Sequence, residues 1–219
     1  MDRVTEAFTW PVRDPEWLSK LLIMALTLLI PIVGGINGIG WMLATLDRLR
    51  AGEERMAPAN LNYIGRGFRL FVVQLVYGLV VLAIAMVIFL PALALAINQG
   101  RGSANPALIS VALLLYVFGF GITTILRLAF EFAMPAIVLA TDSGGITGGL
   151  QVDAVIRRCR VNPTNTLIAG LMLIAAGFVA SLGLFLCGIG ILFTVAYAFA
   201  MQAWIIRSFE VGSHAATAA

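Results

Sequence analysis

Long apolar segments separated by short polar connections fill most of this chain. A helix that crosses the hydrocarbon core of a bilayer, about 30 Å thick, needs about 20 mainly apolar residues. Four segments have this character, namely 68–97, 106–140, 166–186 and 191–206. The connection between the last two, CGIG at 187–190, is short and uncharged and therefore predicts an antiparallel hairpin. The pattern predicts an all-α, polytopic helical membrane protein with four transmembrane helices.

The first apolar segment, 21–46, contains Pro31 and the glycine-rich run IPIVGGINGIG at 30–40. As one helix it would cross the membrane with a kink, because proline removes a backbone donor and clashes with the preceding turn. As two legs, 21–30 and 36–46, each would extend only about 15–17 Å at about 1.5 Å per residue. That length is half a bilayer and predicts a re-entrant hairpin with PIVGG at its tip. Since irregular backbone is not tolerated in contact with lipid, we expect this tip to pack against other helices.

The basic residues distinguish these two threadings, because arginine and lysine near membrane ends collect on the cytoplasmic side. With 21–46 as a full span, the better orientation puts nine basic residues inside and four outside. With 21–46 as a re-entrant hairpin, twelve lie inside and Arg101 alone lies outside, with Arg127 left out of both counts. The twelve are Arg3, Arg13, Lys20, Arg48, Arg50, Arg55, Arg66, Arg69, Arg157, Arg158, Arg160 and Arg207. The count favours the re-entrant hairpin over the kinked span, and it predicts that both termini are cytoplasmic.

The polar connections predict which parts lie at the membrane surface. Residues 1–20 are expected to form an interfacial segment, because tryptophans beside charged residues suit the headgroup region. Residues 47–67 are expected to form a cytoplasmic loop. Residues 146–160 predict an interfacial amphipathic helix that ends before the next proline. With a flexible tail at 211–219, the whole chain, 1–219, is expected to be a single integral membrane domain.

The composition supports lipid as the solvent for much of the surface. The chain is 61% apolar and 11% charged, with a mean hydropathy of +0.99, whereas soluble domains carry about 25% charged residues. A net charge of +3 is too small to indicate nucleic acid as a partner. Anionic lipid headgroups are the simpler partner for arginines at membrane ends, in a multi-pass protein of the cytoplasmic membrane. The candidates for headgroup contacts are Arg48, Arg50, Arg66, Arg69, Arg157, Arg158 and Arg160.

Three stretches of the sequence resemble a known family. The run FTWPVRDPEWLSKLLIMALTLLIPIVGG at 8–35 resembles the opening of the prokaryotic membrane proteins grouped as domain of unknown function 4013. The similarity continues in LDRLRAGEE at 46–54 and in VIRRCRVNPTN at 155–165, and it covers most of the chain. The resemblance implies a helical membrane fold. It implies no activity and no catalytic residues, since none is assigned to the family. The chain departs from the family in its more polar linker TDSGGITGG at 141–149.

One pair of ionisable residues falls within a predicted span. Arg127 and Glu131 are four residues apart and so lie on one helix face. Ionisable residues within a span are unfavourable and by default suggest function. Arg127 lies about 21 residues from the start of its helix, near the inner membrane boundary, where its side chain can reach the headgroups. A structural ion pair is the favoured interpretation. A proton or ion relay, and contact with a partner or a headgroup, are the alternatives.

The remaining residues do not indicate an enzyme. The single histidine, His214, lies in the tail, and no cluster of His, Cys and carboxylates has metal-ligand spacing, so neither catalytic, metal nor cofactor residues are expected. Asp142 and Asp153 are expected to be solvated loop charges or helix N-terminal charges. We therefore expect a non-enzymatic scaffold, adaptor or complex subunit with an arginine-rich cytoplasmic face, which binds membrane lipids and a protein partner or a second copy. The alternative is a small transporter or channel that uses Arg127 and Glu131.

Small residues on the last two helices predict close helix packing, because small faces let backbones approach in membranes. They are Ala169, Ala176, Ala180, Gly183 and Cys187 on one helix, and Ala196, Ala200 and Ala203 on the other.

Overall fold

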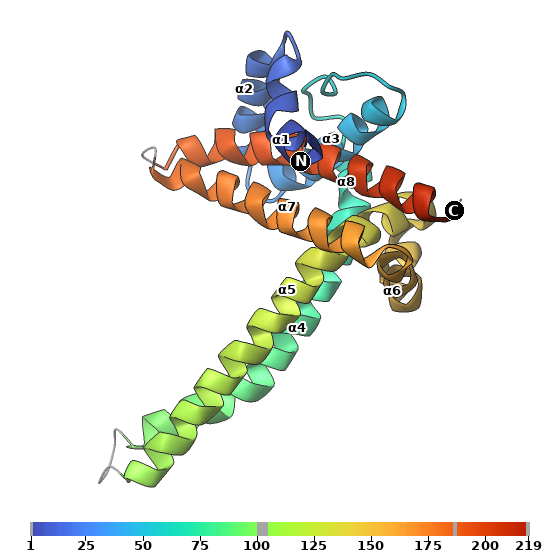
Figure 1. Cartoon of the computed structure of the whole chain (residues 1–219). Helices are drawn as coiled ribbons and strands as arrows, with labels where there is room; N and C mark the ends of the chain where they lie inside the picture. Colours follow the sequence, from blue (N-terminus) through green and yellow to red (C-terminus); the bar gives the residue numbers. More distant parts are fainter. Residues whose placement is uncertain (1, 100–104, 186–187, 218–219) are drawn as a thin grey trace. The chain divides into compact units, whose positions relative to one another are not determined.

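The computed structural model describes residues 2–99, 105–185 and 188–217, which are all-helical and contain no strand. The elements in chain order are α1 (Asp2–Thr9), η1 (Trp10–Arg13), α2 (Trp17–Leu28), α3 (Val33–Arg50), α4 (Ile64–Gln99), α5 (Pro106–Leu150), α6 (Val152–Val161), α7 (Pro163–Leu182), η2 (Gly183–Phe185) and α8 (Gly190–Thr217) (Figure 1). Four of them, α4, α5, α7 and α8, are long and apolar enough to cross a membrane. The prediction of an all-α fold with four such helices is confirmed. Arg101 and Cys187, which the sequence places in an outer loop and a turn, lie outside the described residues.

The chain divides into two compact units. The first, called here the body, comprises Met1–Val73 and Glu131–Ala219. The second, called here the apolar hairpin, comprises Gln74–Phe130, so that α4 and α5 each contribute to both units.

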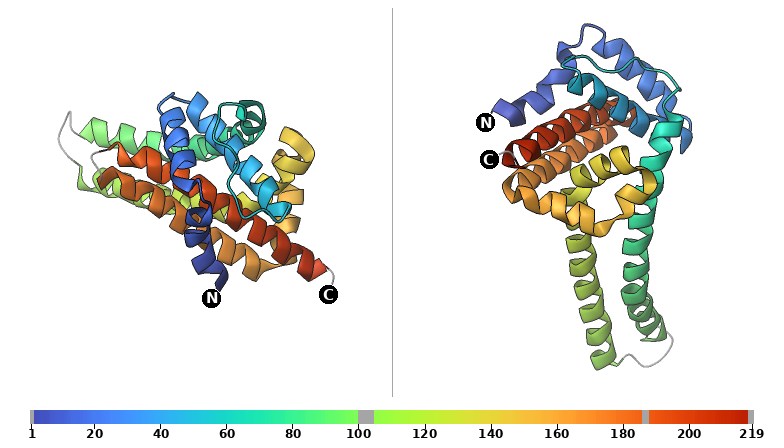
Figure 2. Two further views of the ribbon diagram at one scale, coloured as in Figure 1. Left: turned by 90° about the horizontal axis from the view of Figure 1, so that it is seen from above. Right: turned by 90° about the vertical axis from the view of Figure 1, so that its right-hand side faces the viewer.

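The apolar hairpin consists of two helix segments that run side by side (Figure 2). They meet through the rings of Phe89 and Tyr116, whose centroids are 5.1 Å apart, and through Gly119, which lies close against Ile88. Most of its large apolar side chains are exposed; Val87, for example, is 75% exposed. A helix that is hydrophobic on all sides is typical of a segment surrounded by lipid.

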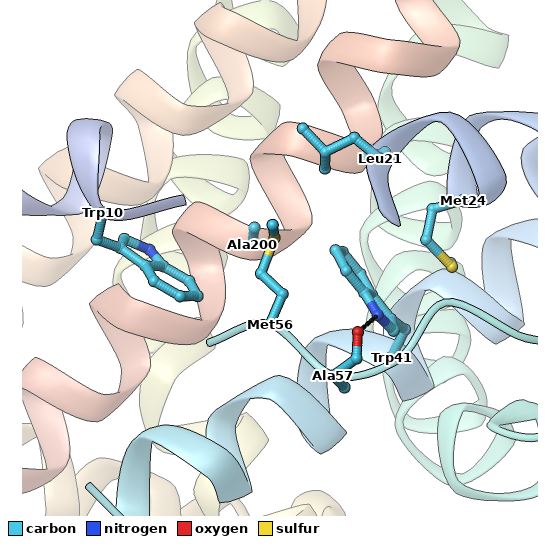
Figure 3. Packing of buried hydrophobic residues seen from close by; sticks show 8 residues of the cluster. Trp10, Leu21, Met24, Trp41, Met56, Ala57 and Ala200 are labelled. Carbon is cyan, nitrogen blue, oxygen red and sulfur yellow. Dashed lines mark hydrogen bonds between the residues drawn. The ribbon is translucent and has the colours of Figure 1, made fainter. Parts of the chain in front are cut away.

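The body is built around α8. Helix α7 packs along one side of α8, while α1, α2, α3 and the loop at 51–63 pack on the other side (Figures 1 and 2). Most of the small residues predicted for close packing are buried, among them Ala176, Ala196 and Ala200, whereas Ala180 is half-buried. Ala196 and Ala200 pack against the N-terminal segment and the loop rather than only against α7 (Figure 3). The small face of α8 therefore admits a third layer of chain.

The segment at 21–46 forms two helices, α2 and α3, with a break at 29–32 that includes Pro31. The break has a tight backbone, since Ile32 has a φ of 64° and a side chain on Gly34 would overlap the preceding turn. Two legs separated at the proline therefore agree with the structure. The expectation that the tip packs against other helices is wrong for the described chain, because Ile32 is 72% exposed and only Gly34 is buried. Within this chain no described segment covers the apolar side chains of the tip.

The loop at 51–63 is tied to α3 by three buried polar side chains at four-residue spacing. Asn37 Nδ2 donates to the carbonyl of Asn60 at 2.8 Å, and Asn37 Oδ1 accepts from the amide of Tyr63 at 3.2 Å. Trp41 Nε1 donates to the carbonyl of Ala57 at 2.9 Å (Figure 3). Thr45 Oγ1 accepts from the amide of Ala57 at 3.2 Å. Residues 37, 41 and 45 share one helix face, so α3 holds the loop along its length.

Several predicted boundaries shift. The predicted loop at 47–67 is shorter because α3 continues to Arg50 and α4 begins at Ile64. The predicted helix at 146–160 is interrupted at Gln151; the part before it continues α5 beyond a kink at Gly145, where φ is 65°. The expected flexible tail at 211–219 is helical to Thr217, because its alanines favour helix and no proline ends it.

Candidate functional site

The most prominent polar feature of the body is a network of ion pairs between the ends of four helices. Arg50, in the last turn of α3, forms a bidentate pair with Glu210 of α8, with Nε–Oε2 and Nη2–Oε1 distances of 3.0 and 2.9 Å. Arg50 Nη1 also donates to Asp142 of α5 at 2.7 Å. Arg66, in the first turn of α4, donates to the other oxygen of Asp142 at 2.7 Å. Asp142 therefore joins two arginines that lie on different helices.

Asp47 and Arg207 complete this network. Asp47 accepts from Arg66 through both carboxylate oxygens and from Arg50 at 3.2 Å. Arg207 Nη1 donates to Glu210 at 3.0 Å. Three arginines face three carboxylates, so the network is balanced in charge.

The network is only partly open to solvent. The side chains of Asp142 and Glu210 are 14% and 17% exposed, and that of Arg50 is 27% exposed. Burial disfavours the charged guanidinium of Arg50, but its hydrogen bonds to Glu210 and Asp142 outweigh this and raise its pKa above the ordinary value. Bidentate pairs of arginine with carboxylates have a fixed geometry. The network therefore holds α3, α4, α5 and α8 together.

Two pockets lie beside the network. The first, of about 440 Å³, is lined by both apolar and charged side chains. Its lining residues are Arg50, Leu139, Asp142, Ser143, Arg158, Val161, Phe209, Glu210 and Ser213. The second, of about 410 Å³, is lined by Leu43, Gly65, Arg66, Arg69, Thr141 and Asp142. Each pocket contains one arginine that takes no part in the ion pairs of the described residues, Arg158 in the first and Arg69 in the second.

A separate buried ion pair holds the N-terminal segment. Lys20 Nζ donates to Asp14 Oδ2 at 2.8 Å and to the carbonyl of Met56 at 3.2 Å, while the amide of Met56 donates to Asp14 at 2.8 Å. The amide of Glu16 donates to the other oxygen of Asp14 at 2.9 Å. Burial disfavours the charged carboxylate, but the hydrogen bonds from Lys20 and the two amides outweigh it, so the pKa of Asp14 lies below its usual value. This pair fastens the loop at 51–63 to residues 14–20.

The arginines predicted to contact headgroups fall into two groups. Arg50 and Arg66 are held in the network, and Arg48 donates to the carbonyl of Met56 and pairs with Glu53 at 3.7 Å. The other four are exposed and take no part in the ion pairs of the described residues. They are Arg69, Arg157, Arg158 and Arg160. Contact with headgroups remains a prediction, now centred on these four.

Arg127 and Glu131 both lie in α5, on the two sides of the boundary between the units. Neither is a member of the network described above, and their pairing stays a prediction. Asp153 lies exposed in the first turn of α6, as expected for a helix N-terminal charge.

Asp142 differs from the expectation of a solvated loop charge, because its helix continues past it and directs it at Arg50 and Arg66. Sequence reasoning also missed Asp47, Glu210 and the pair of Asp14 with Lys20. The only signal for them was a carboxylate at or near a predicted helix end, which is common in any helical protein. No group of three or more metal-ligating side chains is present within the residues that the structure describes.

Comparison with known proteins gives one family. Residues 23–189 match the family described as "Protein of unknown function (DUF4013)", which is more than half of the chain. No curated protein and no solved structure matches the chain.

Proposed function

The chain belongs to this family of unknown function, and we propose that it is a non-enzymatic membrane scaffold or complex subunit that binds anionic phospholipid at the arginine-rich face of its body. The observation that carries this proposal is the first pocket, whose lining combines Arg158, which has no ion pair among the described residues, with apolar side chains. A phospholipid has the matching chemistry, since its phosphate suits a free guanidinium and its acyl chains suit Leu139, Val161 and Phe209.

The network supports a fixed framework rather than a moving path for solutes. Its charges are paired with one another across four helices, so the arrangement is rigid and leaves no spare carboxylate to carry a proton. In the apolar hairpin, the hydroxyls of Ser110 and Thr123 donate to carbonyls of their own helix. A transporter would normally use polar side chains near the midplane to bind its substrate. These contacts favour the scaffold over the transporter.

The arginine distribution supports a location in the cytoplasmic membrane, with both termini on the cytoplasmic side. The exposed arginines of α6 then meet the anionic headgroups of the inner leaflet. The exposed tip between α2 and α3 fits a re-entrant position in the lipid, or contact with a partner or a second copy of the chain.

Lipid binding is tested with purified protein, freed of lipid in mild detergent, to which short-chain phosphatidylglycerol or phosphatidylcholine is added and counted by native mass spectrometry. We expect phosphatidylglycerol to bind preferentially, and Arg158→Gln to weaken this binding about tenfold, as for loss of a charge-assisted hydrogen bond. Arg157→Gln is the matched control, because Arg157 is an exposed neighbour on α6 that does not line the pocket. Equal loss in both variants would indicate a diffuse charge effect and would contradict a specific pocket. Competition by inorganic phosphate alone would indicate a phosphate site without a role for the acyl chains.

The scaffold and the transporter are separated by flux measurements in proteoliposomes. Ion or proton flux that disappears in Arg127→Leu and Glu131→Gln, without loss of protein, would favour the transporter. The scaffold predicts no flux above empty vesicles.

A further inference from the structure

Charged segments of the chain pack against the middle of α8. Trp10 of η1 and Met56 of the loop at 51–63 belong to one buried cluster with Ala196 and Ala200 of α8 (Figure 3). The hydroxyl of Tyr197 donates to the carbonyl of Phe8, so the N-terminal segment is fixed at the same level.

If α8 crosses the membrane, the part of α8 around Ala196 and Ala200 lies well inside the bilayer. The candidate span is Gly190–Ser213, 24 residues long. At about 1.5 Å per residue, Ala196 and Ala200 lie about 9 and 15 Å from Gly190, well inside a hydrocarbon core of about 30 Å.

The segments at this level carry exposed charges. Arg55 is exposed and directly precedes the buried Met56, and Arg13 lies three residues after Trp10. Arg13 and Glu54 approach within 3.8 Å across the two segments, with side chains 49% and 73% exposed. Exposed charges and irregular backbone are strongly disfavoured at the centre of a bilayer. The part of this side formed by η1 and the loop at 51–63 therefore needs water.

The opposite side of the body needs lipid. Helix α7 buries Ala169, Leu173 and Ala176 in the body and exposes a continuous apolar strip that includes Leu167, Leu171 and Phe178. The preceding helix, α6, exposes three arginines beside the start of α7. Such a strip suits contact with lipid, and the arginines beside the start of α7 suit the headgroup region at that end.

We propose that α7 and α8 lie along the cytoplasmic membrane interface, with the exposed strip of α7 in the lipid and the loop at 51–63 in water. The apolar hairpin is then the part of the chain that crosses the membrane. The length and composition of α7 and α8 permit them to cross the membrane. The exposed charges of the segments that pack on α8 favour instead a position along the membrane surface, called here the flat position.

The apolar hairpin is long enough to serve as the membrane anchor by itself. Its segments 74–99 and 106–130 extend about 39 and 37 Å, which exceeds the hydrocarbon thickness. Arg127, near its end, is the one charged residue among the described residues of the hairpin. The tally of basic residues stays at twelve on the cytoplasmic side and one outside. Residues 183–190 contain no charge, so the tally does not depend on the side of the membrane on which they lie.

The proposal is tested by determining on which side of the membrane the connection between α7 and α8 lies. A short hydrophilic epitope inserted after Gly188 is compared, in intact spheroplasts and inverted vesicles, with epitopes after Gly52 and after Asn105. We expect the Gly188 epitope to react with antibody in the same preparation as the Gly52 epitope. Reaction in the same preparation as the Asn105 epitope would show that α7 and α8 span, and the proposal would be wrong.

A depth measurement avoids any disturbance from an insertion. A fluorophore is placed at Leu167→Cys or at Phe178→Cys, each in a chain with both natural cysteines replaced by serine, and quenched by lipids brominated at known depths. These exposed positions are 11 residues apart, about 16 Å along α7. The flat position predicts equal depths. A difference near 16 Å would overturn it, whether or not lipid binds beside Arg158.

Discussion

The buried pair of Asp14 and Lys20 should contribute more to stability than any exposed ion pair of the chain. The carboxylate of Asp14 is 1% exposed and accepts three hydrogen bonds, from Lys20 and from the amides of Glu16 and Met56. In Asp14→Asn the side-chain amide has one oxygen where the carboxylate has two. Either the Glu16 amide, or Lys20 Nζ and the Met56 amide, would therefore face an NH₂ group instead of an acceptor. The variant also leaves the buried ammonium of Lys20 with only the exposed carboxylate of Glu16, 3.4 Å away, as a counter-charge.

The expected magnitude follows from this burial. Removing one partner of a buried ion pair costs about 3–5 kcal/mol when the remaining charge is desolvated without compensation. Because the exposed carboxylate of Glu16 still lies near Lys20, we expect the lower end of this range. At about 2–4 °C per kcal/mol for a unit of this size, the melting temperature should fall by on the order of 10 °C. The assay is thermal unfolding in mild detergent, followed by intrinsic fluorescence. Arg13→Gln is the matched control, since its pair with Glu54 is exposed and such pairs contribute about 0–1 kcal/mol.

The double variant Asp14→Asn/Lys20→Met supplies the decisive comparison. It removes both charges, so it should be more stable than Asp14→Asn alone. If Asp14→Asn melts within about 2 °C of the natural protein, or if the double variant is no more stable than the single one, the pair does not fasten the loop as described.

The remaining predictions concern pH, glycine packing and the charged pair of α5. Because the pKa of Asp14 is lowered on folding, its stabilisation should be complete above the unfolded value of about 3.9 and lost as the pH falls through the folded value, so Asp14→Asn should unfold with a weaker acid dependence below about pH 4. Gly40→Ala should lower the melting temperature, because its Cβ would overlap the carbonyl of Tyr63, whereas Gly35→Ala, with open space at its Cβ, should leave it unchanged or raise it slightly. Glu131→Gln should be less stable than the double variant Arg127→Leu/Glu131→Gln if the two residues are structural partners; equal stability would contradict that pairing.

The helices could be predicted because their signals are local. Apolar runs of sufficient length gave α4, α5, α7 and α8, and Pro31 marked the break between α2 and α3. Each of these depends on a few consecutive residues and on the solvent that surrounds them. Asn37, Trp41 and Thr45 also share a regular spacing, but nothing in the sequence shows that a loop lies on that face of α3.

The sequence by itself determined that this is a helical protein with lipid-facing segments, and where its four long apolar helices lie, although two of them, α5 and α8, continue about ten residues beyond their predicted ends. Composition and periodicity suffice for this, since backbone hydrogen bonds within a helix and the transfer of apolar side chains into lipid act on each segment separately. Only the tertiary structure decided which charges meet. Arg50 is paired with Asp142 and Glu210, which are 92 and 160 residues away along the chain, and every arginine had the same apparent choice of partners. The packing of α3, α5 and α8 selects these partners, because an ion pair forms only where the folded backbone brings two side chains within reach and shields them from water.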